Sequence, residues 1–324
     1  MIRQFILFSS CIYGFLLIGY FSKRKRWIET EKSTTLMKGS IFFLEPVIIV
    51  STFWALDISD LRILSLPLTA SLLSLFILLP AQLFSKLHHH IPKDKGAYFG
   101  GSMFSNIGLS LGGFLCFLLL GEQGLGLAFA YMAYFIPFFF SIGFYIARRI
   151  SLSAETKGNV RSLTWRENLK ASLQDPLGIV PTVAILVGLA FNFSGLERFQ
   201  ILSTINKILV PLSVAVYSFA IGLTMKFRKL REYLPECLTM SIIKFLISPI
   251  VGVGFAYILG CSDFMGGLAL KVVLIEATMP AAIFSLILAR LFNLNQDLAN
   301  SCWLFTTFAV IFVVPILSFV LRLF

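Results

Sequence analysis

The sequence predicts an all-α polytopic membrane protein. Of the 324 residues, 57% are hydrophobic and 13% are charged, about half the charged fraction of an average soluble chain. With a mean hydropathy of +0.87 and 34 phenylalanines, the chain has more apolar surface than one soluble core can bury. Apolar runs of about 20 residues, enough for a helix to cross the hydrocarbon layer, recur from end to end.

Ten such segments are predicted to span the membrane. The first resembles a signal peptide, but KRKR follows it where a small-residue cleavage site would stand, so we interpret it as a span. The ninth and tenth are separated only by a short polar turn. The predicted spans are 4–21, 36–56, 61–84, 97–120, 124–147, 176–193, 201–225, 235–259, 266–292 and 298–321.

The net charge of +11 is explained by topology. Twenty of the 27 Lys and Arg residues lie in, or at the edges of, the loops after the odd-numbered spans, against five on the opposite side. Because Lys and Arg accumulate in cytoplasmic loops, we expect a cell-membrane protein with both termini extracytoplasmic. No nucleic-acid partner is expected. The five scattered cysteines indicate neither a disulfide framework nor a zinc site, and no cofactor or metal is expected.

The longest polar segment, 148–175, has five predicted spans on each side. We interpret it as a cytoplasmic linker near anionic headgroups, with a helix at 164–173. Residues 88–90, three histidines at another cytoplasmic end, are expected to form a solvated loop. A metal site is disfavoured there because no carboxylate or cysteine adjoins them.

The two halves, 1–147 and 176–324, share a pattern. Spans two and seven each carry an early proline, Pro46 and Pro211. Spans four and nine each contain an interruption, at 105–108 and 278–281. An odd number of spans per half requires opposite orientations, so the pattern predicts a 5+5 inverted repeat with broken crossover helices 4 and 9.

The two interruptions form the predicted substrate site. Pro280 has no amide hydrogen and clashes with the carbonyl of Glu276, and Gly108 disfavours a straight helix. In hydrocarbon, irregular backbone survives only where it is buried in protein or lines a wet cavity. Half-helix N-termini favour anions, and Asn106 adds a donor and an acceptor. The predicted substrate-binding residues are Ser105, Asn106, Ile107, Gly108, Thr278, Met279, Pro280 and Ala281.

Four ionisable residues lie inside predicted spans, where a charge costs at least about 2.5–3.5 kcal/mol. Lys244 is expected to find a carboxylate or a freed carbonyl on another span. Lys271 is expected to reach the outer surface by snorkelling, and its five-residue separation from Glu276 argues against a local pair. Glu45 and Glu276 are candidates for proton coupling, with structural pairing as the alternative.

At these residues the sequence resembles the auxin efflux carrier family, the PIN-like bacterial permeases, over essentially the whole chain. The similar strings are Asn106-x-Gly108 followed by Leu120-Gly121-Glu122, Pro211 with Ile221-Gly222-Leu223, Lys244-x4-Pro249, and Ala277-Thr278-Met279-Pro280-Ala281. One departure concerns span four, where the family usually continues with Gly-x-Pro and this chain has Leu111 and Gly113.

The resemblance implies a scaffold of spans one, two, six and seven. It also implies a mobile part in which crossover spans four and nine bind an organic anion, with dimers in some members. We therefore expect a secondary transporter for a small organic anion, preferentially a carboxylate. A proton or sodium is the expected coupling ion, and a homodimer is one expected assembly. A sodium-coupled symporter of a bile-acid-like anion and a non-transporting membrane sensor are the alternatives. An enzyme is disfavoured because the spans lack paired aspartates and Ser/His arrangements.

Overall fold

The computed structural model describes residues 2–58, 60–154, 176–227 and 229–323, which form helices and loops without a strand. Seven segments of this part are long and apolar enough to cross a membrane, and Ile179–Phe193 is a shorter apolar helix. The prediction of a multi-pass helical membrane protein is confirmed, while the count of ten spans stays a prediction. The seven segments are Arg3–Arg24, Lys32–Ala55, Leu61–Leu87, Gly112–Leu152, Ile201–Thr224, Leu234–Ile258 and Gln296–Val320.

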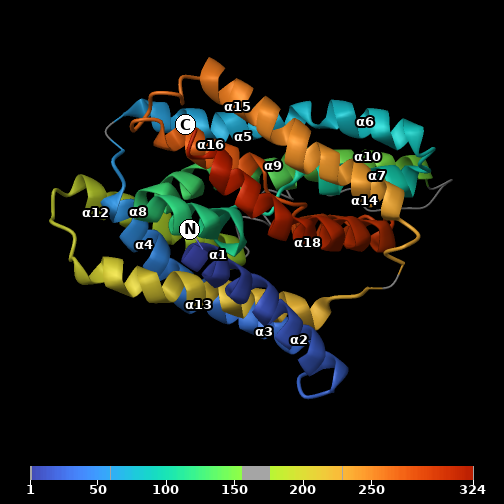
Figure 1. Ribbon diagram of the computed structural model, residues 1–324, viewed down its shortest axis with the longest axis horizontal. Helices are drawn as coiled ribbons and strands as arrows, with labels where there is room; N and C mark the ends of the chain where they lie inside the picture. The colour runs from blue at the N-terminus through green and yellow to red at the C-terminus, as the bar shows by residue number, and fades with distance from the viewer. Residues whose placement is uncertain (1, 59, 155–175, 228, 324) are drawn as a thin grey trace. The chain divides into compact units, whose positions relative to one another are not determined.

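The chain folds into two compact units, and each unit contains segments from both halves of the sequence. The first unit contains the described residues of 1–63, 108–130 and 173–225. Its elements, some of which extend slightly beyond these limits, are α1 (Ile2–Ser9), η1 (Ser10–Gly14), α2 (Phe15–Arg24), α3 (Lys32–Gly39), η2 (Ser40–Leu44), α4 (Glu45–Ala55), η3 (Leu61–Leu64), η4 (Gly108–Ser110), α8 (Gly112–Met132), α12 (Pro176–Phe193) and α13 (Ile201–Thr224). In this unit α13 packs along α2 and α3, and α12 packs along α4 (Figure 1).

The contact between α2 and α13 depends on two glycines. A Cβ atom at Gly19 would lie 2.2 Å from the carbonyl oxygen of Phe219. A Cβ atom at Gly222 would lie 2.2 Å from the carbonyl oxygen of Leu16. Small residues let membrane helices approach backbone to backbone, where dispersion contacts are numerous. These two positions therefore set the distance between the two helices.

The second unit contains the described residues of 64–107, 131–172 and 226–324. Its elements are α5 (Ser65–Phe76), α6 (Leu78–Leu87), α7 (Pro92–Met103), α9 (Phe135–Phe138), η5 (Phe139–Gly143), α10 (Phe144–Ala154), α14 (Leu234–Ile242), η6 (Ile243–Ile247), α15 (Ser248–Ile258), α16 (Leu268–Ala277), α17 (Phe284–Leu291) and α18 (Gln296–Val320). Helix α7 packs against α6, α10, α17 and α18, and α15 packs against α5 and α16.

Several helices contain local irregularities at proline or glycine. The π-helical turns η2 and η6 come just before Pro46 and Pro249, which cannot donate a hydrogen bond to the carbonyl four residues earlier. Within α8, Gly121 departs from helical geometry with φ 76° and ψ −163°. The gap predicted between spans four and five, at 121–123, is thus reduced to one non-helical residue between two helical segments.

The predicted linker begins inside a helix, because α10 continues to Ala154. Its remainder, with the predicted helix at 164–173, lies outside the described residues.

Candidate functional site

Both predicted interruptions are present as breaks in helical structure. The first follows α7 and the second separates α16 from α17, all three of which are helices of the second unit. Helix α7 ends at Met103, and the chain is extended before η4 begins at Gly108. Helix α16 ends at Ala277, three residues before Pro280, and α17 begins at Phe284. Gly108, which the compact-unit division assigns to the first unit, has φ 74°, a left-handed conformation that favours glycine.

The structure brings these two breaks together. Ser105 and Ala281 form an isolated antiparallel β-bridge. The amide of Asn106 donates to the carbonyl of Pro280 at 2.8 Å, and the amide of Ala282 donates to the carbonyl of Phe104 at 3.0 Å. Each break thereby supplies hydrogen-bond partners for backbone groups of the other. Non-helical backbone at membrane depth requires such partners, because lipid offers none.

The side chains around this pairing are buried. Asn106 is 8% exposed, Thr278 is 4% exposed, and Met279 and Ala281 are fully buried. The hydroxyl of Thr278 donates back to the carbonyl of Leu274 at 2.6 Å. The amide of Ala281 donates to the hydroxyl of Thr306 in α18 at 3.3 Å. The predicted substrate-binding residues of the second unit therefore lie in one buried, polar cluster.

Lys244 is held against the first break. Its fully buried ammonium group donates to the carbonyls of Ser102 at 2.7 Å and Phe104 at 2.9 Å, and to the hydroxyl of Ser105 at 2.9 Å. The freed carbonyls that the sequence predicted for Lys244 are thus its partners. Within the described part of the chain, no carboxylate lies within ion-pair distance of this ammonium group.

The other three charges that were predicted to lie inside spans are placed differently. Glu276, in the last turn of α16, is fully buried. Lys271 lies one turn into the same helix and is partly exposed. Glu45 belongs to the first unit, where it begins α4 and accepts a hydrogen bond from the hydroxyl of Tyr217. Glu45 therefore has a hydrogen-bond partner within its own unit.

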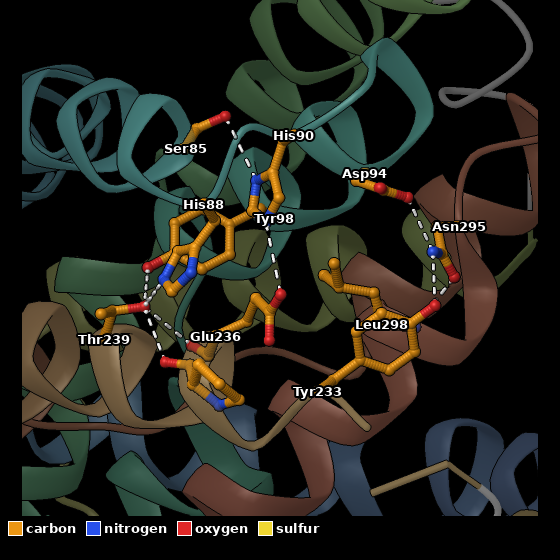
Figure 2. A network of polar contacts seen from close by, with 11 residues as sticks. Ser85, His88, His90, Asp94, Tyr98, Tyr233, Glu236, Thr239, Asn295 and Leu298 are labelled. Atoms are coloured by element: carbon orange, nitrogen blue, oxygen red, sulfur yellow. Dashed lines mark hydrogen bonds and ion pairs between the residues drawn. The ribbon is translucent and has the colours of Figure 1, made fainter. Parts of the chain in front are cut away.

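A polar network ties together the ends of four helices in the second unit (Figure 2). Thr239 of α14 accepts from the Tyr98 hydroxyl at 2.8 Å and lies 3.0 Å from Nε2 of His88. Asn295, the N-cap of α18, donates to Asp94 at 2.7 Å and to the Tyr233 hydroxyl at 2.9 Å.

This network corrects the expectation of a solvated histidine loop. The His90 side chain is only 3% exposed, stacks on His88, and lies 3.9 Å from a carboxylate oxygen of Glu236. Burial, together with repulsion from His88, lowers the pKa of His90, while Asp94 and Glu236 act in the opposite direction. The expectation was wrong for His88 and His90, because side chains of α14 and α7 contact them, whereas His89 is exposed as expected. Contacts from distant segments cannot be seen in the local sequence.

A second polar cluster, in the first unit, was missed by the sequence interpretation. Arg198 forms a two-pronged ion pair with Glu122, at 2.7 and 3.1 Å. Ser203 and Asn206 donate to the same carboxylate at 2.8 and 2.7 Å, and Ser51 donates to Asn206 at 2.9 Å. The sequence did contain a signal for this cluster, because Glu122 is a charged residue between two apolar segments that only a few residues separate.

Comparison with known proteins agrees with this architecture. Residues 11–318 match the family described as membrane transport protein. An uncharacterized transporter of Methanothermobacter thermautotrophicus is 34% identical over 141 residues, 44% of this chain and 45% of that protein's length. An uncharacterized transporter of Methanocaldococcus jannaschii is 27% identical over 307 residues, 91% of this chain and 92% of that protein. Since the family match covers nearly all of the sequence, the chain belongs to the membrane transport protein family, and its resemblance to the auxin efflux carriers is confirmed.

Proposed function

We propose that the protein is a secondary transporter that moves a small organic anion, preferentially a carboxylate, by alternating access around the paired breaks. The observation that carries this proposal is the position of Lys244. Its amino group, which is positively charged when protonated, is buried behind Ser105, and its hydrogen-bond partners there are neutral oxygens. A buried cation without a carboxylate partner favours an anion at the adjoining break.

The polar groups at the break suit a carboxylate. Asn106 can donate through its side-chain amide. The Ser105 hydroxyl accepts a hydrogen bond from Lys244, which polarises this hydroxyl and makes it a better donor to an anion at the break. The second break precedes the short helix α17, whose N-terminal amides add partial positive charge. Binding a soluble anion in this buried cluster requires a conformational opening, as alternating access does.

The proposed architecture is a 5+5 inverted repeat in which spans four and nine are the broken crossover helices. The helices of predicted spans one, two, six and seven all lie in the first compact unit, which supports their role as a scaffold. In this proposal the termini are extracytoplasmic and the protein resides in the cell membrane. A reporter active only outside the cytoplasm, fused after the last residue, tests that orientation.

Proton coupling is the form of energy coupling that we favour. Glu276 is a fully buried carboxylic acid two residues before Thr278, so its protonation state can respond to occupancy of the break. Sodium coupling is the alternative, with oxygens of Ser105, Asn106, Glu276 and Thr278 as ligands. Flux that persists after complete replacement of sodium, and that follows an imposed pH gradient, distinguishes the proton mechanism. Tight binding without flux would indicate a sensor.

The test begins with thermal unfolding of the purified protein against a panel of carboxylates, at two pH values and with or without sodium. A ligand that binds only the folded state raises the melting temperature. Uptake of the most stabilising ligand is then measured in liposomes that contain the protein, under a proton or sodium gradient. Saturable uptake in the wild type that is lost in Asn106→Ala supports the proposal. Absence of saturable flux under every gradient rejects transport of these anions.

A further inference from the structure

The first unit contains a cavity that none of the proposed transport residues lines. Its volume is about 760 Å³, within the range of ligand-binding pockets. One wall is apolar, with Leu7 of α1, Phe117 and Leu118 of α8, and Pro211 of α13. Arg3, Gln4, Glu122, Ser203 and Lys207 supply its polar groups. The cavity is therefore amphipathic.

Two elements of the chain fix the shape of this cavity. Gly121, with φ 76°, interrupts α8 at the lining, and a side chain there would meet open space. The side-chain amide of Gln4 donates to the carbonyl of Leu118 at 2.5 Å, which fastens the start of α1 to the end of the first helical segment of α8. The space is thus bounded by bonded elements and is part of the folded unit.

The charge of the cavity is positive. Glu122 is the acidic lining residue, and its carboxylate is already engaged by Arg198, Ser203 and Asn206. Arg3 and Lys207, both exposed, form no ion pair with any residue that the structure describes. The two cations therefore stand beside a neutralised carboxylate and an apolar wall.

We propose that this cavity binds an anionic phospholipid. The phosphate lies between Arg3 and Lys207, and part of an acyl chain lies along Leu7, Phe117 and Leu118. Basic groups beside membrane helices attract anionic headgroups. Ile6, the residue before Leu7 in α1, is 57% exposed, and α1 is part of a segment long and apolar enough to span the membrane. An acyl chain can therefore pass from the cavity along this helix into the bilayer. A small soluble anion would leave most of the apolar wall unused.

The experiment measures thermal unfolding of the full-length protein in neutral detergent during titration with dioleoylphosphatidylglycerol. Dioleoylphosphatidylcholine, which has the same chains and no net charge, and glycerol 3-phosphate, which has the phosphate and no chains, are titrated in parallel. Phosphatidylglycerol should stabilise the protein at the lowest concentration. The double variant Arg3→Gln, Lys207→Gln should raise the required concentration at least about tenfold.

Two further variants make the result specific. Leu7→Trp fills the apolar part without a change of charge and should weaken phosphatidylglycerol binding while the lipid-free melting temperature stays near that of the wild type. Arg62→Gln removes a half-exposed cation that does not line the cavity and should have no effect. Equal stabilisation by phosphatidylcholine, equal stabilisation by glycerol 3-phosphate, or equal weakening by Arg62→Gln would each overturn the proposal.

Discussion

The ammonium nitrogen of Lys244 lies 2.9 Å from the hydroxyl oxygen of Ser105. The same nitrogen also donates hydrogen bonds to the carbonyl of Ser102, in the last turn of α7, and to the carbonyl of Phe104, the residue that follows this helix. One side chain thus stabilises the break structurally and places a positive charge next to it. Structural and transport roles of Lys244 can be separated by comparing variants.

Replacing Lys244 by Met should impair both stability and flux. The substitution leaves the carbonyl of Ser102 without this donor, at a cost of about 1–3 kcal/mol for a buried group left unpaired, whereas the carbonyl of Phe104 keeps the amide of Ala282. Lys271→Met is the matched control, because Lys271 is also an intramembrane lysine and is partly exposed. Thermal unfolding and anion uptake are measured for both. A Lys244→Met protein with wild-type uptake would exclude the proposed role of this charge.

Replacing Asn106 by Ala should weaken carboxylate binding by about tenfold, the effect of losing a hydrogen bond to a charged group. Its backbone amide keeps the bond to Pro280, so the paired breaks should persist. His89→Asn serves as control, since His89 is exposed with φ 52° and Asn tolerates that conformation. The ligand-induced rise in melting temperature reports affinity. Similar losses in both variants would argue against a site at Asn106.

Breaking the Glu122–Arg198 pair should destabilise the first unit more than breaking an exposed pair. Glu122 and Arg198 are 20% and 14% exposed, and two further side chains depend on the same carboxylate. Glu122→Gln should cost about 1–3 kcal/mol. Asp60→Asn, which breaks the exposed Arg62–Asp60 pair, should lower stability less than Glu122→Gln does, because water screens an exposed ion pair. A double-mutant cycle with Arg198→Met should show strong coupling, and additive effects would contradict it.

Alanine at Gly222 should disrupt the packing of α2 on α13, because its Cβ would lie 2.2 Å from a backbone oxygen that cannot move independently. Overpacking of this kind costs about 1–3 kcal/mol or more. Gly14→Ala is the matched control in the same unit, since no atom lies within 4 Å of the added Cβ. The melting temperatures of the two variants are measured in the same detergent. If Gly222→Ala is as stable as Gly14→Ala, the close contact does not control packing.

Local chemistry explains which parts of the molecule could be predicted. Pro280 and Gly108 disfavour helix by their own covalent structure, so the breaks were visible in the sequence. A lysine at membrane depth must find oxygen atoms, so the class of partner for Lys244 was predictable as well. The bond between Asn106 and Pro280, and the pair formed by Glu122 and Arg198 across 76 positions, depend on tertiary packing. No local pattern encodes such distances.

Acidification should destabilise the network around His90. The pKa of His90 is lowered in the folded protein, so the unfolded chain binds a proton more readily. Stability from neutral His90 is fully present above the unfolded value of about 6.5 and is lost as the pH falls through it toward the lower folded pKa. His88 adds to this shift, whereas Asp94 and Glu236 oppose it.

The measurement is the melting temperature between pH 7.5 and 5. His90→Asn keeps a polar group that can bond to Ser85, now 3.2 Å from Nδ1 of His90, and removes the titration. This variant should flatten the pH dependence. Glu236→Gln removes a group that raises the pKa of His90, so the loss of melting temperature should still begin near pH 6.5 but become larger and continue to a lower pH. If the loss of melting temperature becomes smaller in Glu236→Gln, or persists unchanged in His90→Asn, another group controls it.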